Sequence, residues 1–95
     1  MGDVITETYL KQIHSIARSH GAVRIRVFGS HAKGTAHKLS DLDLLVDLEE
    51  GRDLLDLVGL KQDLESLLGH SVDVVTEGAL SPYLREKIMQ EARPL

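Results

Sequence analysis

Apolar and polar residues alternate along this chain with two different periods, and the period changes at glycines. Apolar residues recur every three or four positions between Ile5 and His20, which predicts a helix with Thr6 as its N-cap. Gly21 then stands where a left-handed residue commonly ends a helix. The next segment, VRIRVF at 23–28, alternates apolar and basic residues, and this alternation is typical of a half-buried strand.

The two faces of that strand differ in chemistry. Val23, Ile25 and Val27 share one parity, so we expect all three to face the core. Arg24 and Arg26 share the other parity, and we expect both to be solvated. Basic residues on the outer face of a strand carry no functional inference by themselves.

The rest of the chain continues to alternate between helical and strand patterns. A short helical turn follows Gly29-Ser30 and stops at Gly34, and strands are predicted at 41–48 and 71–76. Between these strands, Asp53 is the predicted cap of a helix that runs to about Leu68 and stops at Gly69.

A last helix is predicted from Ser81-Pro82, an N-cap followed by proline, to about Ala92, and Pro94 ends it. The main elements then follow the order helix, strand, strand, helix, strand, helix. This order predicts an α+β domain with a short mixed sheet packed with helices.

The predicted helix after Asp53 carries a wide apolar stripe. Its members are Leu54, Leu57, Val58, Leu64, Leu67 and Leu68. We expect most of the stripe to form core, because helical spacing of leucines usually does. A domain this small has little room to bury so many leucines, so part of the stripe, together with the last helix, is also a candidate partner surface.

Composition limits the class of protein. The chain has 95 residues, of which 42% are hydrophobic, and we expect one domain spanning 1–95. It has no cysteine, no signal peptide and no membrane-spanning stretch, which fits a cytoplasmic protein. The net charge of −4 disfavours general nucleic-acid binding. The five histidines have no metal-ligand spacing and are predicted to be surface or helix-end residues.

Candidate chemistry is concentrated in the stretch GSHAKGTAHKLSDLDLLVDL, which begins at Gly29. A strand that ends in Gly-Ser and enters a short helix leaves backbone N–H groups free to bind phosphate, and the Ser30 hydroxyl adds a donor. Asp41 and Asp43 lie on one face of the following strand, and Asp73 lies on a later strand. Three such carboxylates favour a two-metal site for phosphoryl chemistry.

A less specific interpretation exists for each aspartate. Asp41 could cap a turn, and Asp43 and Asp73 could be edge or surface residues. The combination of all three behind a Gly-Ser turn is what favours the metal site.

The same stretch resembles the signature of the DNA polymerase β-like nucleotidyltransferase superfamily, in which Gly-Ser precedes a basic-glycine turn and Ser-Asp-x-Asp. The short chain is similar to the minimal nucleotidyltransferase group of that superfamily, and Asp73 in VDVV corresponds to the third carboxylate. Lys33 stands where arginine is common, and lysine lacks the bidentate fork of arginine. The resemblance implies an α/β-type nucleotidyltransferase core.

The resemblance also implies roles for the site residues. Gly29, Ser30 and Lys33 would hold the triphosphate of ATP. The three aspartates, Asp41, Asp43 and Asp73, would bind Mg²⁺, with two ions expected and Asp73 activating the acceptor hydroxyl.

Members of this group are antitoxins of HEPN-domain ribonuclease toxins, and several transfer AMP to a tyrosine of the toxin. The resemblance therefore implies a metal-dependent protein adenylyltransferase with a HEPN partner. Two alternatives stay open: an antitoxin that neutralises its partner by binding alone, and a transferase acting on a small molecule. The sequence leaves the nucleotide base, the acceptor and any homo- or hetero-oligomeric state open.

Overall fold

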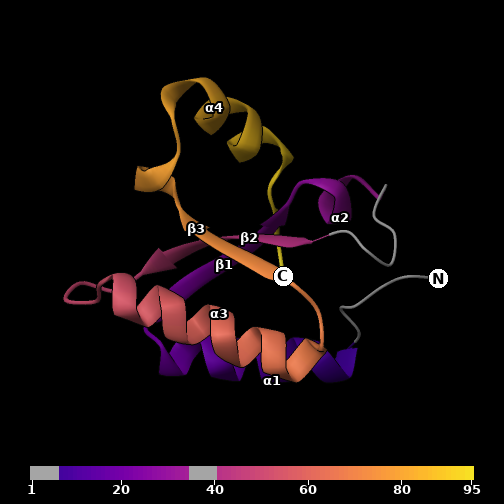
Figure 1. The fold of residues 1–95 in the computed structure, drawn as a ribbon. Helices are drawn as coiled ribbons and strands as arrows, with labels where there is room; N and C mark the ends of the chain where they lie inside the picture. The colour runs from indigo at the N-terminus through magenta and orange to yellow at the C-terminus, as the bar shows by residue number, and fades with distance from the viewer. Residues whose placement is uncertain (1–6, 35–40) are drawn as a thin grey trace.

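The structure, a computed structural model, describes residues 7–34 and 41–95 (Figure 1). Its elements are α1 (Glu7–Ser19), β1 (Ala22–Phe28), α2 (Ser30–Lys33), β2 (Leu42–Leu48), α3 (Leu54–Leu68), β3 (Val72–Thr76), the 3-10 helix η1 (Glu77–Ala79), α4 (Pro82–Glu91) and β4 (Arg93–Pro94). The predicted helices and strands are confirmed in order and type. The predicted N-cap Thr6 and the preceding Ile5 lie outside the described residues.

The sheet is mixed, as predicted. Its strand order is β3-β2-β1-β4, with β1 antiparallel to β2 and β2 parallel to β3. The chain connects the two parallel strands through α3, because parallel neighbours need a crossover. Helices α1 and α3 lie side by side on one face of the sheet, and α4 lies on the other (Figure 1).

The core fills the layer between the sheet and the pair α1 and α3. Its buried members are Ile13, Ala17, Ile25, Val27, Leu42, Leu44, Val46, Leu60, Leu64 and Val72. Alternate residues of β2 point into this layer, which leaves the intervening residues, Asp43 among them, on the face covered in part by α4. The period-2 pattern of β2 thus separates the core face from the face that carries the acidic residues.

Two predictions for β1 are wrong. Val23 is 69% exposed and Arg26 is only 5% exposed. The register slips between Ala22 and Arg24, so Val23 is the extra residue of a bulge and leaves the core face. Arg26 lies on the opposite face of the strand, where its guanidinium is 3.9 Å from Asp47 Oδ2.

The termini of α3 and α4 follow the predicted capping chemistry. The Asp53 side chain accepts a hydrogen bond from the helix backbone, and Asp56 completes a capping box. Gly69 ends α3 in the left-handed conformation. Ser81 caps α4, and Pro82 occupies its first turn.

The leucine stripe of α3 is divided between core and surface. Of its predicted members, Leu64 is fully buried and Leu57, Leu67 and Leu68 pack partly buried against the core, whereas Leu54 and Val58 are exposed. The interpretation of the stripe as core is therefore wrong for Leu54 and Val58 and right for the other four members. Within residues 7–34 and 41–95, no helix is both long and apolar enough to cross a membrane.

The sequence did not predict two short elements, one after β3 and one after α4. The 3-10 turn η1 separates β3 from α4, and β4 pairs with β1 at the edge of the sheet. Helix α4 ends at Glu91, and Pro94 takes part in strand pairing instead of merely ending the helix. Proline is tolerated in this position because an edge strand does not need every N–H group.

Strand β3 lies at the opposite edge of the sheet, and two side chains of α3 cap its first residue. The Val72 N–H donates to Glu65 Oε2 at 2.9 Å, and Lys61 Nζ donates to the Val72 carbonyl at 2.6 Å. Lys61 and Glu65 also form an ion pair at 3.0 Å. The hydrogen bond from Val72 and the ammonium of Lys61 hold the pKa of Glu65 below its usual range.

We expect Glu65→Ala to lower the stability of the fold, because the Val72 amide loses its acceptor at the sheet edge. A carboxylate with a lowered pKa stabilises the fold above its unfolded-state pKa, and this contribution is lost as the pH falls through the lowered folded-state value. The stability difference between wild type and Glu65→Ala should therefore shrink on acidification. Thermal unfolding followed from neutral pH to about pH 3 measures it. Glu86→Ala, at an exposed glutamate of α4, is the control; an equal effect of both variants would contradict the capping role.

Candidate functional site

The turn from β1 into α2 has a backbone that only glycine adopts easily. Gly29 has φ +73° and ψ −150°, and a β-carbon built there would lie 2.4 Å from Asp43 Oδ2. Glycine therefore lets the turn approach the carboxylate directly. Ser30 begins α2, so the predicted strand-to-helix turn has the connectivity expected from the sequence.

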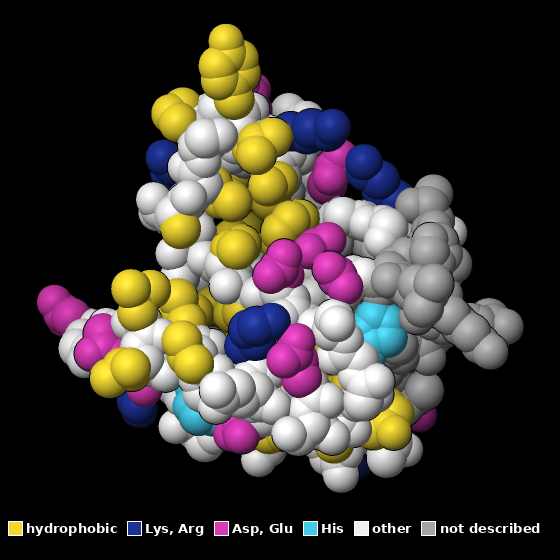
Figure 2. Space-filling model, viewed as in Figure 1, with side chains coloured by type: hydrophobic (Ala, Val, Ile, Leu, Met, Phe, Trp, Pro, Cys, Tyr) yellow, Lys and Arg dark blue, Asp and Glu magenta, His cyan; other side chains and the backbone are white. Residues whose placement is uncertain are grey.

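Two of the three predicted carboxylates are neighbours across the sheet. Asp43 of β2 is the register partner of Asp73 of β3, so both point to the same face. Asp41 is exposed and lies directly before β2, which begins one residue later than predicted. Figure 2 shows acidic side chains gathered on this face beside a hollow lined by hydrophobic side chains.

The electrostatics of Asp43 reflect this crowding. Burial raises the pKa of the Asp43 carboxyl above its usual range, and the neighbouring charges of Asp73 and Asp41 raise it further. His31 of α2 acts in the opposite direction and lowers the pKa of Asp43. The fold thus holds Asp73 and Asp41 close enough to Asp43 to repel its charge.

We expect Asp43→Asn to stabilise the metal-free protein, because it removes a partly buried charge that its neighbours repel. Water partly screens these charges, so the gain should be only about 0.5 kcal/mol, or roughly 2–4 °C in Tm. Thermal unfolding in EDTA measures the change. Glu50→Gln, at an exposed carboxylate shortly after β2, is the control; a fall in Tm for Asp43→Asn would show that the repulsion is not a significant cost.

The Lys33 side chain forms an ion pair with Glu91. Its Nζ lies 3.1 Å from Glu91 Oε1, and this ion pair joins α2 to the last turn of α4. The Lys33 side chain is 48% exposed, so its ammonium still reaches solvent beside the turn. The predicted role of Lys33 in phosphate binding stays a prediction, and the contact with Glu91 was not anticipated.

Two histidines to which the sequence pattern assigned no role meet beside α2, and one of them, His31, is close enough to Asp43 to affect its pKa. The rings of His31 and His70 meet edge to face with centroids 5.8 Å apart. His31 belongs to α2 and His70 precedes β3, so the tertiary fold alone brings them together. The position of His31 directly after Gly29-Ser30 was a usable sequence signal, whereas His70 had none.

The described residues do not form a complete protein cage for a metal ion. Among residues 7–34 and 41–95, no three His, Cys, Asp or Glu side chains converge closely enough to hold a metal. Mg²⁺, however, commonly binds through one or two carboxylates together with water and substrate phosphates. The adjacent pair Asp43 and Asp73 fits that mode of binding.

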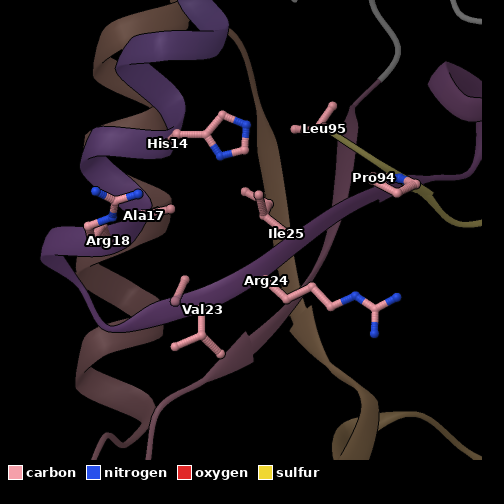
Figure 3. A pocket seen from close by; sticks show the side chains of 9 residues that line it. His14, Ala17, Arg18, Val23, Arg24, Ile25, Pro94 and Leu95 are labelled. Carbon is pink, nitrogen blue, oxygen red and sulfur yellow. The ribbon is translucent and has the colours of Figure 1, made fainter.

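A separate pocket lies on the other side of the sheet, between α1 and β1. It has a volume of about 440 Å³ and is lined by residues that include His14, Arg18, Ile25 and Leu95. Figure 3 shows His14 pointing from α1 towards Ile25 and Leu95, and the Arg24 side chain pointing away from α1. No predicted site residue and no carboxylate side chain lines this pocket, which makes it a poor candidate for metal-dependent chemistry.

The sequence matches a known family over nearly its whole length. The nucleotidyltransferase domain family matches residues 8–95. A Methanocaldococcus jannaschii protein provisionally assigned as a protein adenylyltransferase is 44% identical over 82 residues, covering 86% of this chain and 88% of that protein. The protein adenylyltransferase MntA of Thermococcus cleftensis is 38% identical over 90 residues, covering 86% and 91%.

Solved structures agree with this match. A structure provisionally described as a minimal nucleotidyltransferase has 52% identity and a TM-score of 0.81, covering 98% of this chain and 96% of that one. A toxin–antitoxin structure with AMP-PNP contains a chain with 28% identity and a TM-score of 0.75, covering 88% of this chain and 69% of that one. The predicted fold class is confirmed by these neighbours.

Proposed function

Because the chain belongs to the nucleotidyltransferase domain family, we propose that it is a metal-dependent protein adenylyltransferase. It transfers AMP from ATP to a tyrosine hydroxyl of a HEPN-domain toxin and so acts as an antitoxin in the cytoplasm. The observation that carries the proposal is the register of β2 and β3, which sets Asp43 beside Asp73 on the face that Gly29 approaches.

The residues present fit a nucleotide with its metal ions. Asp41, Asp43 and Asp73 offer the hard oxygen ligands that Mg²⁺ prefers, and their mutual repulsion gives a cation a favourable place. Two bound Mg²⁺ ions would supply charge neutralisation at the reacting phosphate. Gly29 and Ser30 would hold the triphosphate, because the turn lets phosphate oxygens approach the backbone N–H groups.

The chain's own residues then have separate tasks in the transfer. The tyrosine oxygen attacks the α-phosphorus, the new O–P bond forms, and the bond to the pyrophosphate oxygen breaks. Asp73 takes the hydroxyl proton and passes it to solvent, since its carboxylate is exposed at the sheet edge. Lys33 would contact the departing phosphates from α2, in exchange for or alongside its bond to Glu91.

Relatives support the acceptor class. MntA of Thermococcus cleftensis is named a protein adenylyltransferase, and the similar chain in the toxin–antitoxin structure occurs with an ATP analogue. The proposal extends these properties to this chain on the basis of 38% and 28% identity and the shared fold.

The direct test is transfer by the purified protein. Incubation with ATP, Mg²⁺ and the HEPN-domain protein proposed as its partner should increase the intact mass of the HEPN protein by one or more AMP units. EDTA in place of Mg²⁺ should prevent the increase. A HEPN protein that stays unmodified but is still neutralised would instead support inhibition by binding alone.

Nucleotide binding itself should depend on metal. Without a cation, the triphosphate would face three carboxylates of the same sign, so we expect the affinity for ATP to fall at least about tenfold in EDTA. Titration calorimetry with a non-hydrolysable ATP analogue measures the difference. Equal affinities with and without Mg²⁺ would contradict the assignment of the aspartates to metal.

A further inference from the structure

The proposed function determines from which side the acceptor must approach. Across the sheet, β2 with Asp43 stands between β1, which leads into Gly29 and Ser30, and the edge strand β3 with Asp73. In phosphoryl transfer the attacking and leaving oxygens lie roughly in line. If the pyrophosphate leaves on the β1–α2 side, the attacking hydroxyl arrives on the β3 side.

The segment that follows β3 is η1 and then α4, and none of its residues is fully buried. None of the residues of α4 is buried. Tyr83 is 95% exposed and Leu84 is 53% exposed. In a chain with only 3% aromatic residues, a fully exposed tyrosine next to a half-exposed leucine leaves apolar surface without an intramolecular partner.

Two ion pairs nevertheless hold α4 in a defined place. Glu91 binds Lys33 of α2, and Arg85 binds Glu77 of η1. Residues three or four apart lie on the same face of a helix, so Leu84, Ile88 and Glu91 form one face, and the contact with Lys33 turns that face towards α2. Leu84 is 53% exposed although it lies on the same helix face as Glu91, which contacts α2.

On the face of the sheet that α4 partly covers, the acidic pair Asp43 and Asp73 is followed directly by an apolar pair. Leu45 and Val75 are register partners, two residues beyond Asp43 and Asp73 on the same face. Leu45 is fully buried and Val75 is half-buried. Figure 2 shows the result as a hollow lined by hydrophobic side chains, open to solvent and bordered by acidic side chains.

We propose that this hollow, between the sheet face that carries Val75 and the α4 face that carries Leu84, with the exposed Tyr83 beside it, binds the apolar segment of the acceptor protein that carries the modified tyrosine. This inference rests on the proposed function. The occupant is defined by two features: apolar side chains that cover Leu84 and Tyr83, and an aromatic ring whose hydroxyl points to the carboxylate edge. An acidic acceptor segment is disfavoured, because it would face Asp43 and Asp73.

The experiment compares exposed apolar residues on two different helices. Leu84→Ser and Tyr83→Ser change the proposed surface, and Leu54→Ser changes a 75% exposed leucine of α3. For each variant, the KM for the HEPN protein in AMP transfer, the Kd for that protein without ATP, and the affinity for ATP are measured. Circular dichroism checks that each variant is folded.

We expect Leu84→Ser to raise the KM and Kd for the HEPN protein about tenfold, with the affinity for ATP unchanged and Leu54→Ser like wild type. Unchanged KM and Kd in both α4 variants would overturn the inference. A loss of ATP affinity with unchanged KM would also overturn it, since the hollow would then hold the nucleobase. If wild type transfers no AMP, the proposed function fails, and the Kd values still decide whether α4 binds the HEPN protein.

Discussion

Asp73→Asn is expected to reduce AMP transfer by about 10²- to 10⁴-fold, the range typical for loss of a general base. Asparagine keeps the shape of the side chain but cannot take the hydroxyl proton or offer an ionised oxygen to a metal. Asp73 is exposed at the edge of the sheet, so we expect little change in the stability of the fold. The rate is followed by intact mass of the HEPN protein under single-turnover conditions.

Asp63→Asn is the matched control for this prediction. Asp63 is an exposed aspartate of α3 whose carboxylate contacts His20 at 2.7 Å, on the far side of the sheet from Asp73. It should transfer AMP as fast as wild type. If Asp73→Asn kept the wild-type rate, the edge carboxylate would not be the base. If it lost transfer but still protected cells from the toxin, neutralisation would not require catalysis.

Gly29→Ala is expected to abolish measurable binding of ATP, although it adds only one methyl group to the turn. The new β-carbon would lie 2.4 Å from Asp43 Oδ2, closer than real β-carbons approach an oxygen. The backbone at φ +73° and ψ −150° also disfavours any residue with a side chain, at a cost of about 1–3 kcal/mol. Either the turn or the Asp43 carboxylate must move, and both belong to the proposed nucleotide site.

Gly51→Ala is the control, because it places alanine at a positive φ without a clash between the new β-carbon and a neighbouring atom. Gly51 has φ +91°, but a β-carbon there meets no atom within 4 Å. Calorimetric titration with an ATP analogue and Mg²⁺ should show wild-type affinity for Gly51→Ala and none for Gly29→Ala, with both variants folded by circular dichroism. Normal affinity in folded Gly29→Ala would place the triphosphate elsewhere.

Local patterns were sufficient for most elements of this fold. Helix caps such as Asp53 and Ser81 act within one turn of chain, so their effect is visible in the sequence. The alternation in β2 likewise predicted that Asp43 lies on one face of the strand, and the core residues Leu42, Leu44 and Val46 lie on the other, because the pleat imposes a period of two. The pattern failed at Val23, where a bulge shifts the register by one residue, and a bulge has no reliable local signal.

For the candidate site, too, some features were visible in the sequence and others depended on the tertiary structure. The sequence by itself determined the residue types and their order: a Gly-Ser turn, then Asp41 and Asp43, then Asp73 on a later strand. These features resemble a known signature because phosphate binding at a turn and metal binding by carboxylates each need particular side chains at short spacing.

Only the tertiary structure decided which of these groups meet. The parallel pairing of β2 and β3 set Asp73 beside Asp43, and the path of the chain brought Glu91 to Lys33 and His70 to His31. It also left Leu84 half exposed over the sheet, although helical spacing alone could not separate a core leucine from a surface one. The physical reason is that such contacts join residues far apart in the chain, and their geometry depends on strand order and helix packing instead of local periodicity.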